Sequence, residues 1–177
     1  FSVVRYMPKI NFCLNCGHAM DERLAFGKVR PVCPACKRVH FIDPKVAAAV
    51  LLEREGKVLL TRRVGDPQRG LWVTPGGFVD ADEDPKTAAV RECEEETGLK
   101  IEIVELLDVL STRGFPNSAS IVIFYRGKVI GGELRAGDDA DRVEWFGPDE
   151  LPEIAFESTK RVLERWKKNS QIPRPKS

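Results

Sequence analysis

Several features that would point to particular protein classes are missing from this chain of 177 residues. No apolar run approaches the roughly 20 residues that a membrane-spanning helix needs, so we expect no membrane partner. The formal net charge is only +1, without the strong basic excess typical of nucleic-acid-binding proteins, which favours the absence of a nucleic-acid partner. The alternative stays open because residues 11–42 contain Arg23, Lys28, Arg30, Lys37 and Arg38. No signal peptide is visible, which predicts a cytoplasmic protein. The chain starts at Phe1, so residues 1–10 are expected to be a tail or a remnant of expression, with Met7 as the native start.

Cysteine is sparse but strictly spaced. Four of the five cysteines form two Cys-x-x-Cys pairs, Cys13 with Cys16 and Cys33 with Cys36. Two such pairs at this separation are typical of a four-thiolate zinc site, and a closed set of four thiolates makes the zinc structural. Disulfides are the alternative, which a reducing compartment disfavours. Residues 11–42 are therefore predicted to form a small zinc ribbon of two short hairpins.

The remaining cysteine and the two histidines carry weaker signals. Cys93 falls among apolar positions of a predicted helix and is expected to be a small core residue. His18 and His40 both lie in the ribbon segment, where each could at most replace a thiolate.

Beyond Asp43-Pro44 the pattern is that of alternating strands and helices. Apolar, β-branched runs predict strands, and a turn at residues 54–56 predicts a hairpin between the first two. Helical spacing predicts two helices. The predicted strands span 46–53, 57–63, 101–111, 120–129 and 142–146, and the helices 85–97 and 158–168. This pattern indicates an α/β domain over 43–170, followed by a tail at 171–177.

The most informative stretch, residues 77–99, reads GFVDADEDPKTAAVRECEEETGL. Asp84-Pro85 is a strong helix start and Gly98 a natural stop. On that helix Glu92, Glu95 and Glu96 stand at i, i+3 and i+4, on one face. Like charges at this spacing cost about 0.2–0.5 kcal/mol per pair. A divalent cation with oxygen ligands would neutralise them, and Mg²⁺ or Mn²⁺ suits substrate phosphates best. A merely solvated acidic face is the alternative.

Written as a template, this stretch matches the Nudix box at every specified position, and the chain resembles the Nudix hydrolases. The resemblance implies an α/β/α sandwich with a mixed sheet, preceded here by the zinc ribbon. It also implies metal-dependent hydrolysis of a pyrophosphate bond. By position, the implied metal ligands are Glu92, Glu95, Glu96 and the Gly76 carbonyl, and the implied orienting residues are Arg91 and Glu83.

The family often recruits a further acid from a later loop. The candidates in this sequence are Asp138, Asp139, Asp141 and Glu144, with a solvated turn as the alternative for each. Among them Asp139 and Glu144 are taken as substrate-site residues. Three arginines could meet phosphates or simply be solvated: Arg62, Arg63 and Arg69.

A ribbon before a Nudix box resembles the NADH pyrophosphatases and a related group that acts on ADP-ribose or FAD. Residues 111–118 lack the tryptophan and two of the prolines of the NADH-type motif. We therefore predict ADP-ribose, FAD or a related nucleoside diphosphate derivative as substrate, with Phe115 and Pro116 forming one wall of its pocket. The alternatives are an NADH pyrophosphatase, a nucleoside triphosphate sanitising enzyme, and a nucleic-acid-binding or ligand-sensing Nudix protein. A homodimer is compatible with all of them.

Overall fold

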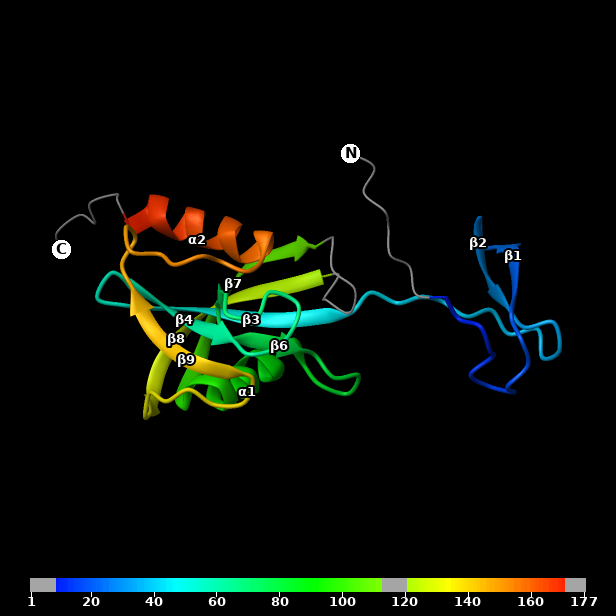
Figure 1. Ribbon diagram of the computed structural model, residues 1–177, viewed down its shortest axis with the longest axis horizontal. Coiled ribbons are helices and arrows are strands. Elements are labelled where there is room, and N and C mark those ends of the chain that lie inside the picture. The colour runs from blue at the N-terminus through cyan, green and yellow to red at the C-terminus, as the bar shows by residue number, and fades with distance from the viewer. Residues whose placement is uncertain (1–8, 113–120, 171–177) are drawn as a thin grey trace. The chain divides into compact units, whose positions relative to one another are not determined.

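The computed structural model describes residues 9–112 and 121–170. The chain divides after Pro44 into two compact units, which Figure 1 shows coloured along the sequence. None of the helices in the described part of the chain is long and apolar enough to cross a membrane.

The first unit is held together by one hairpin and two tight turns. Strands β1 (Asp21–Ala25) and β2 (Lys28–Val32) pair antiparallel. Each Cys-x-x-Cys pair forms a turn, and beside each turn lies an isolated bridge, Phe12 to Ala19 and Val32 to Val39. The expected second regular hairpin is therefore absent from the described residues, because these turns close over single bridges and not over strands.

The first unit has almost no apolar core. Its only buried residues within 9–44 are Cys13, Cys33 and His40. Hairpins of this size need an additional restraint to stay folded, and a bound metal is the usual one.

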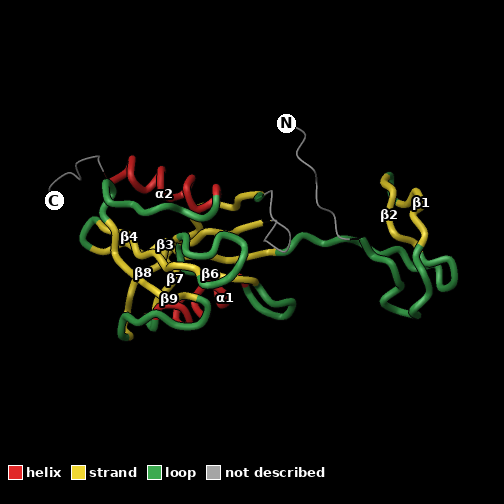
Figure 2. The backbone as a smooth tube through the Cα atoms, in the orientation of Figure 1, coloured by secondary structure: helices red, strands yellow, loops and turns green. Residues whose placement is uncertain are grey.

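The second unit is built on a seven-stranded mixed sheet with the order β5-β4-β3-β8-β7. Short β6 pairs with β3, and β9 pairs with β4. The strands of the sheet are drawn in yellow in Figure 2. β3 and β8 run parallel, and the other strand pairs run antiparallel. The strands are β3 (Val46–Arg54), β4 (Lys57–Arg63), β5 (Trp72–Val73), β6 (Gly76–Phe78), β7 (Leu99–Ser111), β8 (Ile121–Gly132) and β9 (Ala140–Phe146).

Helices α1 (Pro85–Thr97) and α2 (Glu157–Ser170) cover opposite faces of this sheet (Figure 1). The alternation along β3 explains the arrangement. Leu51 packs in one core cluster with Leu163 of α2, and Val50 packs in another with Cys93 of α1. The predicted α/β/α sandwich with a mixed sheet is confirmed.

Local sequence signals account for the elements nearest the site. The Asp84 carboxylate accepts a hydrogen bond from the Lys86 amide at 2.8 Å and so caps α1. Gly98 ends the helix in the left-handed region, φ 70°, and its amide donates to the Glu94 carbonyl. The predicted helix at 85–97 is confirmed at both ends.

Other boundaries are longer than predicted. β7 begins at Leu99, β8 runs on to Gly132, and α2 extends from Glu157 to Ser170. The added strand residues include polar and glycine positions, such as Lys100 paired with Gly131, that carry no alternating pattern. Pairing with a neighbouring strand holds them extended where propensity alone would not.

Candidate functional site

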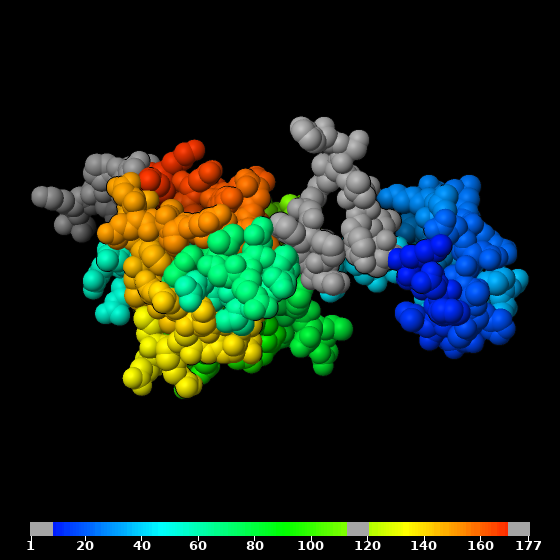
Figure 3. Space-filling view, viewed as in Figure 1, coloured from blue at the N-terminus to red at the C-terminus, as the bar shows by residue number. Residues whose placement is uncertain are grey.

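A cavity of about 910 Å³ opens in the second unit. Its walls come from the start of β3, from β6, from α1, from the ends of β7 and β8, and from the segment that opens α2. The β4–β5 loop closes one side of it. That loop lies against the segment before α2, turquoise beside orange in Figure 3. At the end of the loop, the Trp72 amide of β5 donates a hydrogen bond to the Glu153 carbonyl of that segment at 3.0 Å.

Glu92 and Asp138, which both line this cavity, form a group of three carboxylates with Glu95. Glu92 and Glu95 lie one turn apart on α1, and Asp138 comes from the loop between β8 and β9. One carboxylate oxygen of each lies within 4.8 Å of the others. Hard oxygen donors this close fit a divalent cation, which would offset their mutual repulsion.

Arg91 holds the acidic groups of α1 in place. Its Nε and Nη2 donate to Glu83 at 3.0 and 2.9 Å, and its Nη1 donates to Glu92 at 2.8 Å and to Glu95 at 3.1 Å. Hydrogen bonding from Arg91 lowers the pKa of Glu83. The planar guanidinium can serve three carboxylates at once because its donors are fixed in a fork.

Glu96, the third glutamate expected to bind metal, has different surroundings from Glu92 and Glu95. Its side chain is buried, only 4% exposed, and it accepts hydrogen bonds from the Gly76 amide at 3.2 Å and from the Thr61 hydroxyl at 3.3 Å. Burial raises its pKa well above the ordinary value, and the nearby Asp139 carboxylate adds to the shift. Glu96 thus ties α1 to β6 and β4 beneath the cavity.

Burial also raises the pKa of Glu92, against the opposing effect of its hydrogen bond from Arg91. Glu92 therefore holds a proton more readily than an ordinary glutamate when no cation is present.

The two glycines of β6 are required by close approach. A Cβ on Gly76, whose φ is 151°, would lie 2.4 Å from the Ala48 carbonyl oxygen. A Cβ on Gly77 would lie 2.3 Å from the carboxyl carbon of Glu92. The main chain of β6 therefore passes directly beside the carboxylate of α1.

The loop that carries Asp138 is fastened to the C-terminal end of α1. The Arg135 amide donates to the Thr97 carbonyl at 2.9 Å, and the Gly137 amide donates to the Glu96 carbonyl at 3.1 Å. These bonds satisfy helix carbonyls that would otherwise lack partners. A Cβ on Gly137 would lie 2.5 Å from the Glu95 carbonyl oxygen, so glycine lets the loop reach the helix. Asp138 follows at φ 50°, next to Glu95.

The structure separates the four later acids, of which the sequence analysis assigned Asp139 and Glu144 to the substrate site. Asp138 joins Glu92 and Glu95, and Asp139 lines the cavity near Glu96. Asp141 lies elsewhere, in a two-pronged ion pair with Arg62. Glu144 is exposed on β9 and does not line the cavity.

The structure also distinguishes the other residues that the sequence offered as substrate contacts. Of the three candidate arginines only Arg63 lines the cavity; its guanidinium lies 5.1 Å from the Phe156 ring centroid and its Nε donates to the Pro67 carbonyl at 3.1 Å. Phe115 and Pro116 lie outside the described residues. No feature of the sequence singled out Phe156, because its role depends on where α2 begins in space.

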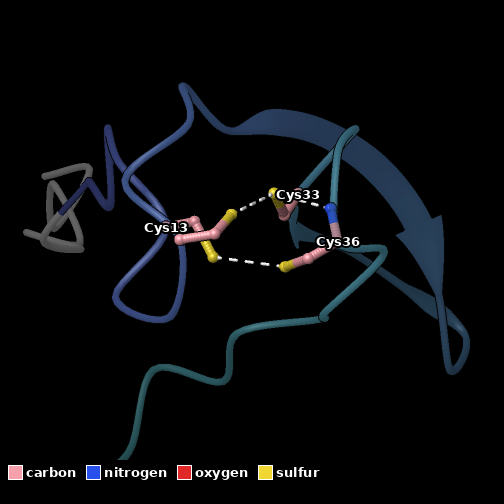
Figure 4. A group of neighbouring side chains, drawn as sticks. Cys13, Cys33 and Cys36 are labelled. Atoms are coloured by element: carbon pink, nitrogen blue, oxygen red, sulfur yellow. Dashed lines mark hydrogen bonds between the residues drawn. The ribbon is translucent and has the colours of Figure 1, made fainter.

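The four cysteines of the first unit converge from two distant segments (Figure 4). Cys13 and Cys36 have their sulfurs 3.6 Å apart, and Cys16 and Cys33 have theirs 3.5 Å apart. A disulfide would need about 2.05 Å. Four thiolates placed about 2.3 Å from one tetrahedral zinc ion would lie about 3.8 Å apart. The geometry fits a zinc site and not a pair of disulfides.

His40 adds a contact to this cluster. Its Nε2 lies 3.2 Å from the Cys13 sulfur, at hydrogen-bonding distance, and its ring is buried. With four sulfurs already gathered, His40 is placed to support a ligand and not to replace one. Cys93, by contrast, is fully buried under α1, and burial raises the pKa of its thiol to about 12. It is a core residue, as expected.

Comparison with known proteins places the second unit in a family. The NUDIX domain model matches residues 43–166. The ADP-ribose pyrophosphatase of Methanocaldococcus jannaschii is 41% identical over 130 residues, which cover 72% of this chain and 77% of that protein. The NAD-capped RNA hydrolase NudC of Stutzerimonas stutzeri is 28% identical over 162 residues, which cover 89% of this chain but only 56% of that protein.

Among solved structures, a NUDIX hydrolase from Nitrosomonas europaea superposes with a TM-score of 0.80 at 32% identity. The superposition covers 90% of this chain and 92% of that one, so the likeness extends well beyond the box. This chain therefore belongs to the Nudix family and is a Nudix pyrophosphohydrolase.

Proposed function

We propose that the enzyme cleaves the pyrophosphate bridge of ADP-ribose or a similar diphosphate-linked adenosine compound, with Mg²⁺ or Mn²⁺ bound by Glu92, Glu95 and Asp138. The observation that carries this proposal is the convergence of these three carboxylates, of which Glu92 and Asp138 line the cavity. The Gly76 carbonyl is proposed as a further ligand from β6. When bound, the cations polarise the phosphoryl oxygens and lower the pKa of a coordinated water.

The protein's own groups then have distinct tasks. Arg91 fixes the orientations of Glu92 and Glu95 through the hydrogen bonds described above. Glu92, whose pKa is raised by burial, is the candidate to accept a proton from the attacking water. Glu96 acts as a positioning residue because its side chain is bonded to β6 and β4.

The reaction is hydrolysis of a phosphoanhydride. Water adds to one phosphorus, the bridging P–O bond breaks, and two monophosphates leave, which for ADP-ribose are AMP and ribose 5-phosphate. Arg63 on the cavity wall offers a cation for the phosphate farther from the carboxylates. Phe78, 45% exposed at the cavity, offers an apolar surface for the base or a sugar. We also keep the proposal that residues 111–118 select the substrate, with Phe115 and Pro116 forming one wall of its pocket.

The choice of ADP-ribose is supported by the relative from M. jannaschii, an ADP-ribose pyrophosphatase at 41% identity, and by the absence of the NADH-type motif. The NAD-capped RNA hydrolase matches more of this chain but at lower identity.

We also propose that Cys13, Cys16, Cys33 and Cys36 bind a structural zinc ion. Free thiols of this kind suit a reducing compartment such as the cytoplasm.

The test is a comparison of kcat/KM for ADP-ribose, FAD, NADH and normal and oxidised nucleoside triphosphates, each with Mg²⁺ and with Mn²⁺. Glu95→Gln removes a carboxylate at nearly constant volume and should lower kcat by about 10²-fold or more, as when an electrostatic stabiliser of a transition state is lost. Glu94→Gln is the matched control. It makes the same change one residue away, at an exposed position outside the cavity, and should leave kcat unchanged.

A preference for triphosphates would replace the proposal with a nucleotide-sanitising function. Near-normal turnover in Glu95→Gln would remove Glu95 from the metal site, whatever the substrate.

A further inference from the structure

The first unit presents an unusual exposed face on its hairpin, which we call the aromatic–arginine face: Arg23, Phe26, Lys28, Arg30 and Phe41. Phe26 is 75% exposed and Phe41 is 49% exposed. Their ring centroids lie 5.8 Å apart. Aromatic rings of this size are normally withdrawn from water, so a pair left open in a unit with so little core calls for a ligand.

The cations of this face come from one side of the hairpin. Arg23 on β1 stands directly opposite Arg30 on β2, and Lys28 lies two residues before Arg30, on the same side of the strand. Arg30 places its guanidinium 4.6 Å from the Phe41 ring centroid. Like charges at directly opposed positions destabilise a strand pair. Arg23 is partly offset by Asp21 at 2.6 Å, and an added anion would offset the remainder.

Phe26 has a backbone conformation that is unfavourable for phenylalanine. It lies at the tip of the hairpin with φ 52°, followed by Gly27 at φ 72°. Positive φ at both central residues is the arrangement for which asparagine and glycine are preferred. A bulky ring at positive φ is a strained choice, and strain of this kind gathers at binding sites.

The balanced charge of the whole chain conceals the charge of this unit. Residues 9–44 contain six Lys and Arg against three Asp and Glu, although the whole chain is only +1. The excess of cations is thus concentrated in the unit that exposes the rings.

We propose that the aromatic–arginine face binds single-stranded nucleic acid. Exposed rings stack on bases of any sequence, and arginine and lysine side chains beside them bind the phosphates. A second copy of this chain fits less well, since a two-fold contact through this face would bring Arg23, Lys28 and Arg30 close to the same cations of the partner. This inference goes beyond the hydrolase function and does not depend on it.

The test is fluorescence anisotropy of a labelled single-stranded RNA of about 12 nucleotides with the whole protein, titrated at several salt concentrations. Phe26→Gly removes the ring and suits the backbone at that position, so the hairpin should persist. It should weaken binding by about 5- to 100-fold, the range expected for loss of one stacked base. Arg30→Gln should reduce the slope of log K against log salt by about 0.7, the value for one phosphate contact on a single strand.

The matched control is Leu24→Ala, which also removes an exposed apolar side chain, 78% exposed, from the same hairpin. Leu24 pairs with Val29, so it lies on the opposite face from Arg23 and Arg30. It should bind within about twofold of the unchanged protein. Phe41→Leu provides a second test of stacking if Phe26→Gly disturbs the turn. Hydrolysis of ADP-ribose should be the same in all these variants, which separates this test from that of the proposed function.

Four results would overturn the proposal. The first is no binding of the single strand at micromolar protein. The second is an equal loss of binding in Leu24→Ala. The third is equally tight binding of a duplex. The fourth is a change of oligomeric state in Phe26→Gly, measured by sedimentation, with RNA binding unaltered, which would make this face an interface between copies.

Discussion

Gly77 and Glu92 lie in direct contact, with the main chain of β6 against the carboxylate of α1. A side chain of even one carbon on Gly77 would lie 2.3 Å from the Glu92 carboxyl carbon. This contact aligns the first acid of α1 with the strand that carries the proposed carbonyl ligand of Gly76. The same contact explains why glycine is needed at this position on grounds of space and not of backbone conformation.

Gly77→Ala should therefore displace the Glu92 carboxylate. Because a shift of about 1 Å at a catalytic group can cost about 10²-fold in rate, we expect kcat to fall by about 10- to 100-fold with the fold retained. Steady-state kinetics and circular dichroism are the measurements. Gly131→Ala is the control, since a Cβ there meets nothing within 4 Å, and its kcat should be unchanged. Equal activity in the two variants would contradict the contact.

Arg91→Lys should separate orientation from charge. Lysine keeps the positive charge but cannot reach Glu83, Glu92 and Glu95 together as the guanidinium does. We expect kcat to fall by about 10- to 100-fold and the concentration of Mg²⁺ needed for half-maximal rate to rise, as when a residue that supports metal ligands is lost. Arg165→Lys, which alters an exposed pair with Asp108, is the control and should change neither quantity. An unchanged requirement for Mg²⁺ would show that Arg91 does not orient the ligands.

The sequence was sufficient for those parts of the fold and site that depend on neighbouring residues. The ends of α1 follow from Asp84, Pro85 and Gly98, whose effects act within one turn. The proximity of Asp138 to Glu95 could not be derived from signals between neighbouring residues. It depends on the loop reaching the end of α1, and among the four later acids Asp138 is marked only by the glycine before it.

Glu96 shows a second limit. Spacing put it on the same helix face as Glu92 and Glu95, and the structure buries it under β6. Helical periodicity gives the direction in which a side chain leaves the helix axis. It does not say which neighbouring element covers that side chain.

Acid stability offers a prediction that does not involve the site. Hydrogen bonding from Arg62 lowers the pKa of Asp141. A carboxyl group with a lowered pKa in the fold stabilises it above the unfolded pKa, and the contribution disappears as pH falls through the folded value. Asp141→Asn should therefore be less stable than the unchanged protein in urea unfolding at pH 7. The difference should begin to shrink near the ordinary pKa of 3.8 and vanish as the pH falls through the lower pKa of the folded state. Asp149→Asn, at a carboxylate 82% exposed, should cost little at pH 7. A difference for Asp141→Asn that persists at low pH would point to packing and not to the ion pair.

The final prediction concerns the first unit. With so few buried residues, the segment 11–42 should keep its structure only while zinc holds its four thiolates. Protein purified without chelator should contain about one zinc per chain, and Cys13→Ser should lose it and become sensitive to limited proteolysis within that segment. Cys93→Ala is the control: its thiol is buried in the second unit, so zinc content should be unaffected even if the core is weakened. Because the second unit has core clusters of its own, its thermal transition should remain in Cys13→Ser. Zinc-free protein with a protease-resistant first unit, or cysteines found paired as disulfides, would contradict the zinc site.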